Sequence, residues 1–194
     1  MIHIVIAGPP GSGKGTQAIR LAEKYGLLHI STGDVLRDAI NKGSTLGRLA
    51  KQKIDNGEFV SDDVAKRIIE EFLDANRDAK GFIFDGYPRT IVQAHLYDEL
   101  LQRLGQKLTG FILHKVEESV LIERLILRAE KSNRADDSDL GVILHRMEIY
   151  NERTVPLIEY YENRSLLHQI VGNNNIDDVF EKICHIIDKL LIDE

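Results

Sequence analysis

Short apolar segments alternate along the chain with longer segments in which apolar residues recur every three or four positions. The short segments are typical of buried strands and the longer ones of amphipathic helices. The expected strands are Ile2 to Ala7, Leu27 to Ile30, Phe82 to Phe84, Gly110 to Leu113, and Leu167 to Val171. The expected helices are Thr16 to Tyr25, Asp34 to Asn41, Leu46 to Asn56, Asp62 to Ala75, Ile91 to Leu104, Ser119 to Ala129, Leu140 to Tyr161 and Asp177 to Leu191. This alternation predicts an α/β fold whose parallel sheet is covered by helices on both faces.

Two regions interrupt the alternation. Residues 31–60 carry helical pattern without a strand, and residues 129–139 are polar with almost no apolar anchors. The first predicts a small helical insert and the second a short mobile flap. Neither has the apolar content for a core of its own, so the 194 residues are expected to form a single domain.

Composition and charge narrow the function classes. The net charge of −6 argues against a broad nucleic-acid or membrane surface, and no apolar run is long enough to span a membrane. The first expected strand starts at the second residue of the sequence, so no signal or transit peptide is expected. Cys184 is the sole cysteine, which excludes a disulfide or a four-cysteine metal site within one chain. A reducing cytoplasm is the expected compartment.

A glycine-rich loop follows the first strand and precedes the first helix. It reads Gly-Pro-Pro-Gly-Ser-Gly-Lys-Gly-Thr over residues 8–16. Such a loop turns successive backbone N–H groups inward and aims a helix N-terminus at one point, which suits polyanionic phosphate. Lys14 adds a mobile charge for the β- and γ-phosphates. A plain turn is the alternative, and both the lysine and the flanking elements argue against it.

One position departs from the common pattern, in which a hydroxyl that ligates magnesium follows the lysine. Here Gly15 takes that place and the hydroxyl moves to Thr16. A magnesium ion is therefore expected to be held by phosphate, water and a carboxylate from elsewhere. Asp85, at the end of an apolar strand, is the candidate carboxylate. An ordinary Asp-Gly turn at Asp85 and Gly86 is the alternative.

Polar residues also follow the second and third strands. Ser31 precedes a helix as an N-cap would, and Asp34 and Arg37 are spaced either for a local ion pair or for a role toward a ligand. Gln93 lies one helical turn beyond Arg89, on the same side. Its amide either reads the edge of a base or is solvated, and the spacing alone does not decide.

Five arginines lie near the expected phosphate site. Arginine offers a planar fork for phosphate oxygens, and a phosphoryl group in transfer needs such a clamp. Asp136 and Asp137 follow closely on one of them and either restrain the arginines or solvate the flap. The five are Arg37, Arg89, Arg128, Arg134 and Arg146.

Taken together, these segments resemble the adenylate kinase family in its short-lid form. The matching segments are residues 8–17, Ser31 to Asp34 with Arg37, Asp85 to Thr90 with Gln93, Arg128, Asn133 to Asp137, and Arg146 to Glu148. The resemblance implies a P-loop NTPase-like three-layer fold with a five-stranded parallel sheet. Its core would be residues 1–30, 61–128 and 140–194, with an AMP-binding insert at 31–60 and a lid at 129–139. The family catalyses ATP + AMP ⇌ 2 ADP with magnesium.

The resemblance also implies site residues, position by position. For ATP these are Gly11, Ser12, Gly13, Lys14, Gly15, Thr16, Arg128 and Asn174. For AMP they are Thr32, Arg37, Glu58, Phe59, Val60, Gly86, Tyr87, Pro88, Arg89, Gln93, Arg134 and Arg146. The catalytic set is Lys14, Asp85, Arg89, Arg128, Arg134 and Arg146, with Asp85 holding magnesium through water.

The chain departs from the long-lid members of the family in lacking the larger lid and its four cysteines, so no structural zinc is expected. The short-lid form suggests a monomer, and the family resemblance implies ATP, AMP and ADP as substrates. No nucleic-acid or membrane partner is expected, in keeping with the net charge. A UMP/CMP kinase is the nearest alternative, although Thr32 and Thr90 fit AMP better. A nucleotide-gated regulator without an acceptor is a second alternative, which would need neither an AMP pocket nor an arginine clamp.

Overall fold

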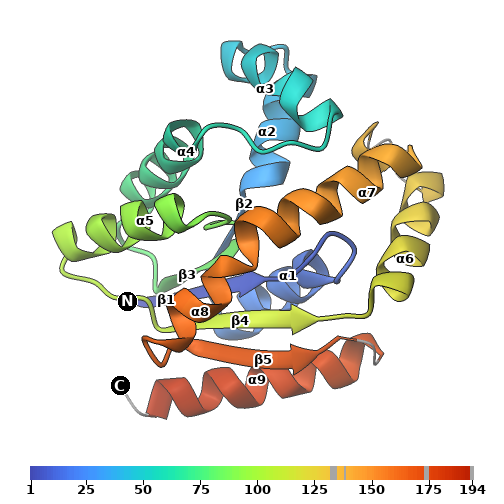
Figure 1. The fold of residues 1–194 in the computed structure, drawn as a ribbon. Coiled ribbons are helices and arrows are strands. Elements are labelled where there is room, and N and C mark those ends of the chain that lie inside the picture. Colours follow the sequence, from blue (N-terminus) through green and yellow to red (C-terminus); the bar gives the residue numbers. More distant parts are fainter. Residues whose placement is uncertain (132–134, 138, 173–174, 193–194) are drawn as a thin grey trace.

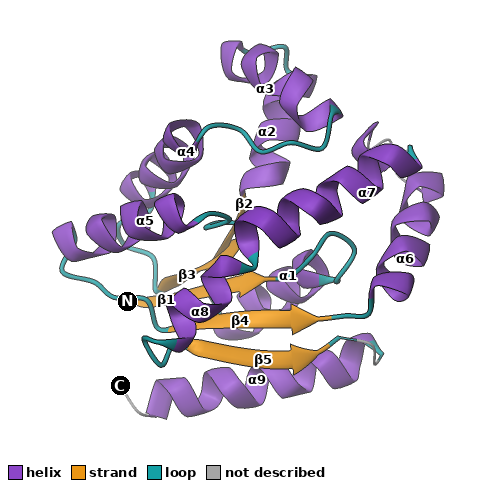
Figure 2. Cartoon of the chain, in the orientation of Figure 1, coloured by secondary structure: helices purple, strands orange, loops and turns teal. Residues whose placement is uncertain are grey.

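The centre of the molecule is a parallel five-stranded sheet. The computed structural model describes residues 1–131, 135–137, 139–172 and 175–192. The strands are β1 (Ile2–Ala7), β2 (Leu28–Ser31), β3 (Gly81–Asp85), β4 (Gly110–Lys115) and β5 (Leu167–Val171). They lie in the order β2-β3-β1-β4-β5, and Figure 2 shows them all pointing the same way. The predicted α/β fold is confirmed, and the strand limits differ from expectation by at most two residues.

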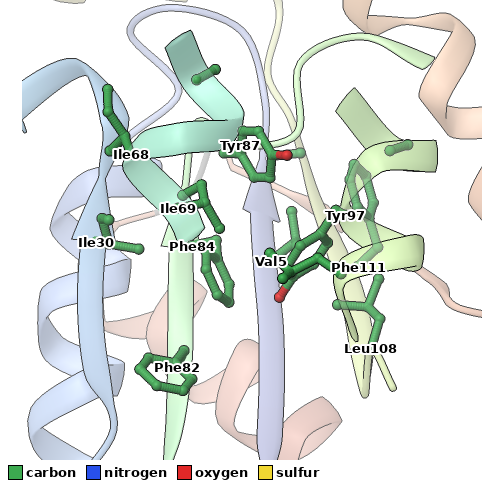
Figure 3. Close-up of a cluster of buried hydrophobic side chains, with 14 of the residues drawn as sticks. Val5, Ile30, Ile68, Ile69, Phe82, Phe84, Tyr87, Tyr97, Leu108 and Phe111 are labelled. Atoms are coloured by element: carbon green, nitrogen blue, oxygen red, sulfur yellow. The ribbon is translucent and has the colours of Figure 1, made fainter. Parts of the chain in front are cut away.

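Alternate residues of the strands bury their side chains on opposite faces of the sheet. On β1, Ile4 and Ile6 face α1 (Lys14–Tyr25) and α9 (Ile176–Ile192), while Val5 belongs to the cluster on the other face. That second cluster joins the sheet to α4 (Asp62–Ala75), α5 (Ile91–Arg103) and α8 (Pro156–Glu162). Within it, the ring of Phe84 from β3 packs against the ring of Tyr97 from α5 (Figure 3). The sheet is buried on both sides, as a parallel sheet requires.

Two helices, α2 (Thr32–Asn41) and α3 (Thr45–Asp55), lie between β2 and α4 and project away from the sheet (Figure 1). Serine side chains cap both helices, because Ser31 and Ser44 accept hydrogen bonds from Asp34 N and Gly47 N. A Cβ at Gly47 would lie 2.1 Å from the Ala39 carbonyl oxygen. Only glycine therefore lets α3 approach the backbone of α2 so closely.

The second half of the chain carries α6 (Glu118–Lys131), the 3₁₀ turn η1 (Ala135–Asp137) and α7 (Leu140–Ile149). The region expected as a lid, 129–139, begins inside α6, and its residues 132–134 and 138 lie outside the described residues. In the part of the chain that the structure describes, no helix is long and apolar enough to cross a bilayer.

The single helix expected from Leu140 to Tyr161 is wrong in detail. A π-helical segment, η2 (Tyr150–Thr154), separates α7 from α8, and the Val155 N–H donates to the Tyr150 carbonyl five residues back at 3.1 Å. Pro156 explains the interruption, because proline has no N–H for the carbonyl four residues earlier and its ring crowds that position. The wider turn accommodates the proline while the rod of α7 and α8 continues (Figure 1).

Candidate active site

A cleft of about 350 Å³ opens at the carboxyl ends of β2 and β3, beside the start of α1. This is where parallel α/β sheets hold their ligands. Its lining brings together the residues predicted from six separate segments of the chain. Among them are Gly11, Gly13, Lys14, Gly15, Thr16, Thr32, Arg37, Glu58, Phe59, Val60, Asp85, Gly86, Arg89, Gln93, Arg128 and Arg146.

The glycine-rich loop has a backbone that only glycine adopts readily. Gly11 and Gly13 have φ values of 81° and 84°, and Gly13 leads into α1 without a side-chain cap. The first N–H groups of α1 therefore remain for a ligand, and the helix N-terminus favours an anion. Ser12 itself is buried, and its hydroxyl makes no hydrogen bond within the described residues. It shapes the loop but does not line the cleft.

Lys14 is held among cations. Its ammonium donates to the Pro9 carbonyl at 3.3 Å. Burial, together with the charges of nearby arginines, lowers the pKa of Lys14 to about 8 against the opposing charge of Asp85. The site thus places positive charge where the protein alone does not fully neutralise it, and a polyphosphate would do so.

Asp85 faces the loop at the position where the missing hydroxyl would stand. It is 8% exposed at the end of β3, and a Cβ placed on Gly15 would lie 3.0 Å from its Oδ2 atom. Gly15 therefore leaves room for the Asp85 carboxylate beside the loop. The described residues contain no cluster of three metal-binding side chains. The single carboxylate of Asp85 would suit a hydrated magnesium ion whose remaining ligands would have to come from phosphate and water.

Arg89 is turned back into the cleft by the bend after β3. Gly86 has a φ of 75°, and its carbonyl accepts a hydrogen bond from Arg89 Nε at 2.7 Å. The guanidinium lies over the Phe59 ring at 5.0 Å from its centroid. Burial, together with the charges of Arg146 and Arg37, lowers the pKa of Arg89 to about 10 against the opposing charge of Asp85.

The side chain of Gln93 is buried, not solvated. Its Oε1 accepts from the Arg89 N–H at 2.8 Å, and its Nε2 donates to Asp62 Oδ1 at 2.8 Å. It still lines the cleft, so the same residue fixes Arg89 and borders the cleft. Thr32 behaves similarly, since its hydroxyl donates to the Gly86 carbonyl at 2.9 Å.

Three other predicted positions show local roles. Arg37 and Asp34 form the local ion pair at 2.6 Å and both line the cleft. Tyr87 points into the core beside Tyr97 and does not line the cleft (Figure 3), and Pro88, joined to it by a cis peptide bond, lies on a smaller cavity next to the cleft.

Two buried aspartates of η1 gather the arginines of α6 and α7. Arg128 donates to both oxygens of Asp137 at 2.6 and 2.8 Å. Arg146 pairs with the same carboxylate at 2.5 Å and with Asp136 at 3.0 Å. Of the two roles left open for these aspartates, restraining the arginines is the one observed. Arg134 and Asn174 lie outside the described residues.

Sequence reasoning missed two residues of this region. Arg124 donates to the Gly172 carbonyl at 3.1 Å and ties α6 to the loop after β5. Its position one helical turn before Arg128 is a signal that the sequence does contain. Thr154 donates to the Arg89 carbonyl at 3.0 Å, across 65 residues, and no local pattern announces such a contact.

A P-loop, the glycine-rich loop of residues 8–16, at the carboxyl end of a parallel sheet, with a cluster of arginines lining the same cleft, defines a P-loop phosphotransferase. The adenylate kinase family model matches residues 6–166. The adenylate kinases of Bacteroides thetaiotaomicron and Flavobacterium psychrophilum are 45% and 42% identical to the chain over 190 residues, which cover 98% of it and 100% of each relative. That of Stenotrophomonas maltophilia is 44% identical over 182 residues, covering 94% of the chain and 97% of the relative. The chain belongs to the adenylate kinase family.

Proposed function

We propose that the protein transfers the terminal phosphoryl group of ATP to AMP, reversibly and with magnesium, to give two molecules of ADP. The observation that carries this proposal is the single cleft in which the P-loop lysine and an acceptor pocket share one set of cations. Lys14 and Arg89 both line it, and so do Thr32 and residues 58–60 of the acceptor side. Donor and acceptor would then lie end to end across these charges.

Positioning and charge stabilisation supply the catalysis. The P-loop N–H groups and Lys14 bind the donor phosphates, while Arg89 and Arg146 face the group being transferred and the acceptor phosphate. Asp85 would hold magnesium through water, and the bound ion would neutralise phosphate charge as a Lewis acid. The AMP phosphate is anionic near neutral pH, so in-line attack needs no general base. The reaction gains most from holding both nucleotides in line.

Water is the competing acceptor, and the arginine-bearing segments exclude it. Asp137 holds Arg128 from α6 and Arg146 from α7 over the cleft. Closure of this region over the phosphates would bring the arginines to the reacting group and displace water at once. AMP is proposed as the acceptor in preference to UMP and CMP because Thr32 and the amide-bearing Gln93 both line the acceptor side of the cleft.

The assay mixes MgATP with each of AMP, UMP, CMP and GMP and follows ADP formation. We expect ADP only when an acceptor is present, with AMP the best of the four. Faster turnover with UMP or CMP would reassign the acceptor, and nucleotide binding without ADP formation would support a regulator instead.

Two substitutions test the roles of the cations. Lys14→Met and Arg89→Ala each remove a positive side chain that would stabilise the phosphoryl group in transfer. The value of kcat is therefore expected to fall by about 100-fold or more. Arg103→Ala is the matched control, because that arginine pairs with Glu70 on the surface. Near-normal turnover of both cleft variants would contradict the proposed mechanism.

We also infer a monomer that works in the cytoplasm, where ATP and AMP are found. Cys184 is a free, buried thiol that suits a reducing compartment. Light scattering would measure the mass in solution. Specific activity that falls on dilution would speak for an obligate oligomer.

A further inference from the structure

Arg89 is fixed at three points by residues from two distant parts of the chain. Its N–H donates to Gln93 Oε1 at 2.8 Å, and its Nε donates to the Gly86 carbonyl at 2.7 Å. Its carbonyl accepts a hydrogen bond from Thr154 Oγ1 at 3.0 Å. The first two contacts are local to the bend after β3. The third comes from the π-helical segment η2, 65 residues further along the chain.

The hydroxyl of Thr154 makes a buried hydrogen bond that holds the backbone of Arg89. Thr154 is 6% exposed, so its hydrogen bond is shielded from water and costs free energy when lost. With Nε committed to Gly86, the terminal amino groups of the Arg89 guanidinium are the part that meets a phosphate. A shift of the Arg89 backbone would move those groups directly, because the carbonyl and the side chain share one Cα.

The π-helical turn explains why Thr154 reaches Arg89. In an uninterrupted α-helix, the eight steps from Arg146 to Thr154 would rotate the side chain by about 800°, leaving the two about 80° apart. Each π-helical residue turns the chain by less, which reduces this offset. Arg146, Tyr150 and Thr154 accordingly line one cavity of about 70 Å³, together with Lys14 and Arg89.

We propose that Thr154 is a positioning residue for phosphoryl transfer, through which η2 fixes the backbone of Arg89. A single helical rod would then orient two arginines: Arg146 from its own α7 segment, and Arg89 through the Thr154 hydroxyl. This inference rests on the proposed function, because the group that Arg89 meets is the acceptor phosphate of that reaction.

Two variants separate the hydroxyl from the packing. Thr154→Val keeps the shape and removes the hydrogen bond, whereas Thr154→Ser keeps the hydroxyl and loses a methyl group. We expect the valine variant to lower kcat by about tenfold with the KM for ATP changed by less than about twofold, since a small misplacement of a catalytic group costs up to about 100-fold. The serine variant should retain most of kcat. Thr154→Ala replaces the valine variant if the latter does not fold.

Thr109→Val is the matched control. Thr109 is also buried, and its hydroxyl accepts a hydrogen bond from the His3 N–H at 3.1 Å, at the other end of the sheet. Its kcat should stay within about twofold of the unsubstituted protein. A role in packing alone would instead make the serine variant worse than the valine variant, and that result would overturn the proposal.

A double variant tests whether Thr154 acts through Arg89. In an Arg89→Ala background, Thr154→Val should lower kcat no further, whereas independent effects would multiply. Additive losses would overturn the proposal.

The ¹H–¹⁵N resonance of the Arg89 Nε group, assigned by its loss in Arg89→Ala, gives a readout without turnover. It should shift or exchange faster in Thr154→Val but not in Thr154→Ser. An unsubstituted protein that makes no ADP from AMP would refute the proposed function, while an unmoved Arg89 resonance would refute the positioning role.

Discussion

Gly57 and Gly43 occupy equivalent places, one residue beyond the C-caps of α3 and α2. Their φ values are 75° and 61°, the left-handed region in which glycine commonly ends a helix. Their surroundings differ. A Cβ on Gly57 would lie 2.5 Å from Arg146 Cγ, whereas nothing lies within 4 Å of one on Gly43. The end of α3 therefore rests directly on an arginine of the cleft.

This pair yields a controlled substitution. Gly57→Ala and Gly43→Ala should each lose about 1 kcal/mol of unfolding free energy, because both force an alanine to positive φ. Only Gly57→Ala should also lower kcat severalfold, because the added methyl displaces Arg146. Denaturant unfolding and steady-state kinetics of the two variants decide the matter, and equal kcat values would mean that the Gly57 contact has no part in positioning Arg146.

At this scale the sequence predicts best what is covalently local. Lys14, Asp85 and Arg89 were found because each follows a strand in a glycine-containing turn, and the structure brings all three to one cleft. Tyr87 was placed at the site for the same reason, yet its side chain belongs to the core. Thr154 was missed because its partner is 65 residues away.

The short 3₁₀ turn η1 links two helices through the charge of its aspartate Asp137. Asp137 is 2% exposed and receives hydrogen bonds from Arg128 and Arg146, which come from two different helices. Burial raises the pKa of Asp137, but the two arginines outweigh burial and hold the pKa below its ordinary value. The carboxylate is thus the link between α6 and α7.

Replacing the Asp137 carboxylate should lower the unfolding free energy relative to the unsubstituted protein at neutral pH, and this difference should be small in acid. Asp137→Asn leaves two arginines facing a neutral group, which should cost about 3 kcal/mol of unfolding free energy at pH 7. A lowered pKa stabilises the fold above the ordinary aspartate value near 4 and loses that effect as pH falls further. The difference from the unsubstituted protein should therefore shrink below about pH 4.

Chemical denaturation at pH 7 and pH 3 measures this difference. Asp74→Asn is the control, because Asp74 pairs with Arg77 on the exposed surface. A loss for Asp137→Asn that is as small as the control loss would show that the buried pairing does not hold α6 and α7 together.

The π-helical segment shows what element-level patterns conceal. The buried residues Ile143, Met147, Thr154, Leu157 and Tyr161 keep helical spacing straight through η2. That spacing predicted one long helix because a hydrophobic pattern records which face is buried and not which carbonyl each N–H meets. Pro156 was the local sign of the interruption.

At the scale of the whole molecule, burial lowers the pKa of three described histidines, of which His3 and His114 are the fully buried ones. His3 lies inside the sheet, bonded to the Tyr97 hydroxyl at 2.9 Å and to Gln106 Oε1 at 2.8 Å. His114 lies near the carboxyl end of β4, beside the P-loop, with Nδ1 3.5 Å from the Ser12 carbonyl oxygen. Burial lowers the pKa of each to about 4.

Global stability should consequently fall in mild acid. Between about pH 6.5 and 4 the unfolded chain binds protons at these histidines and the folded chain does not, so the unfolding free energy drops as pH falls. A pKa lowered by this much corresponds to about 3 kcal/mol for each histidine. His3→Gln, which keeps polar partners and cannot titrate, should flatten the slope over this window.

Thermal or denaturant unfolding across the window gives the slope. His185→Gln is the matched control, since His185 is exposed on α9. An identical slope for His3→Gln and the unsubstituted protein would show that His3 protonates as readily in the folded state as in the unfolded one.

The crowding of Lys14 by Arg89, Arg128 and Arg146 has a practical consequence for handling the molecule. Mutual repulsion of these cations is relieved by any compact multivalent anion that enters the cleft, so sulfate or inorganic phosphate should raise the melting temperature. The same anions would occupy the place of the nucleotide phosphates. A phosphate buffer is therefore a good choice for storage and a poor one for kinetics.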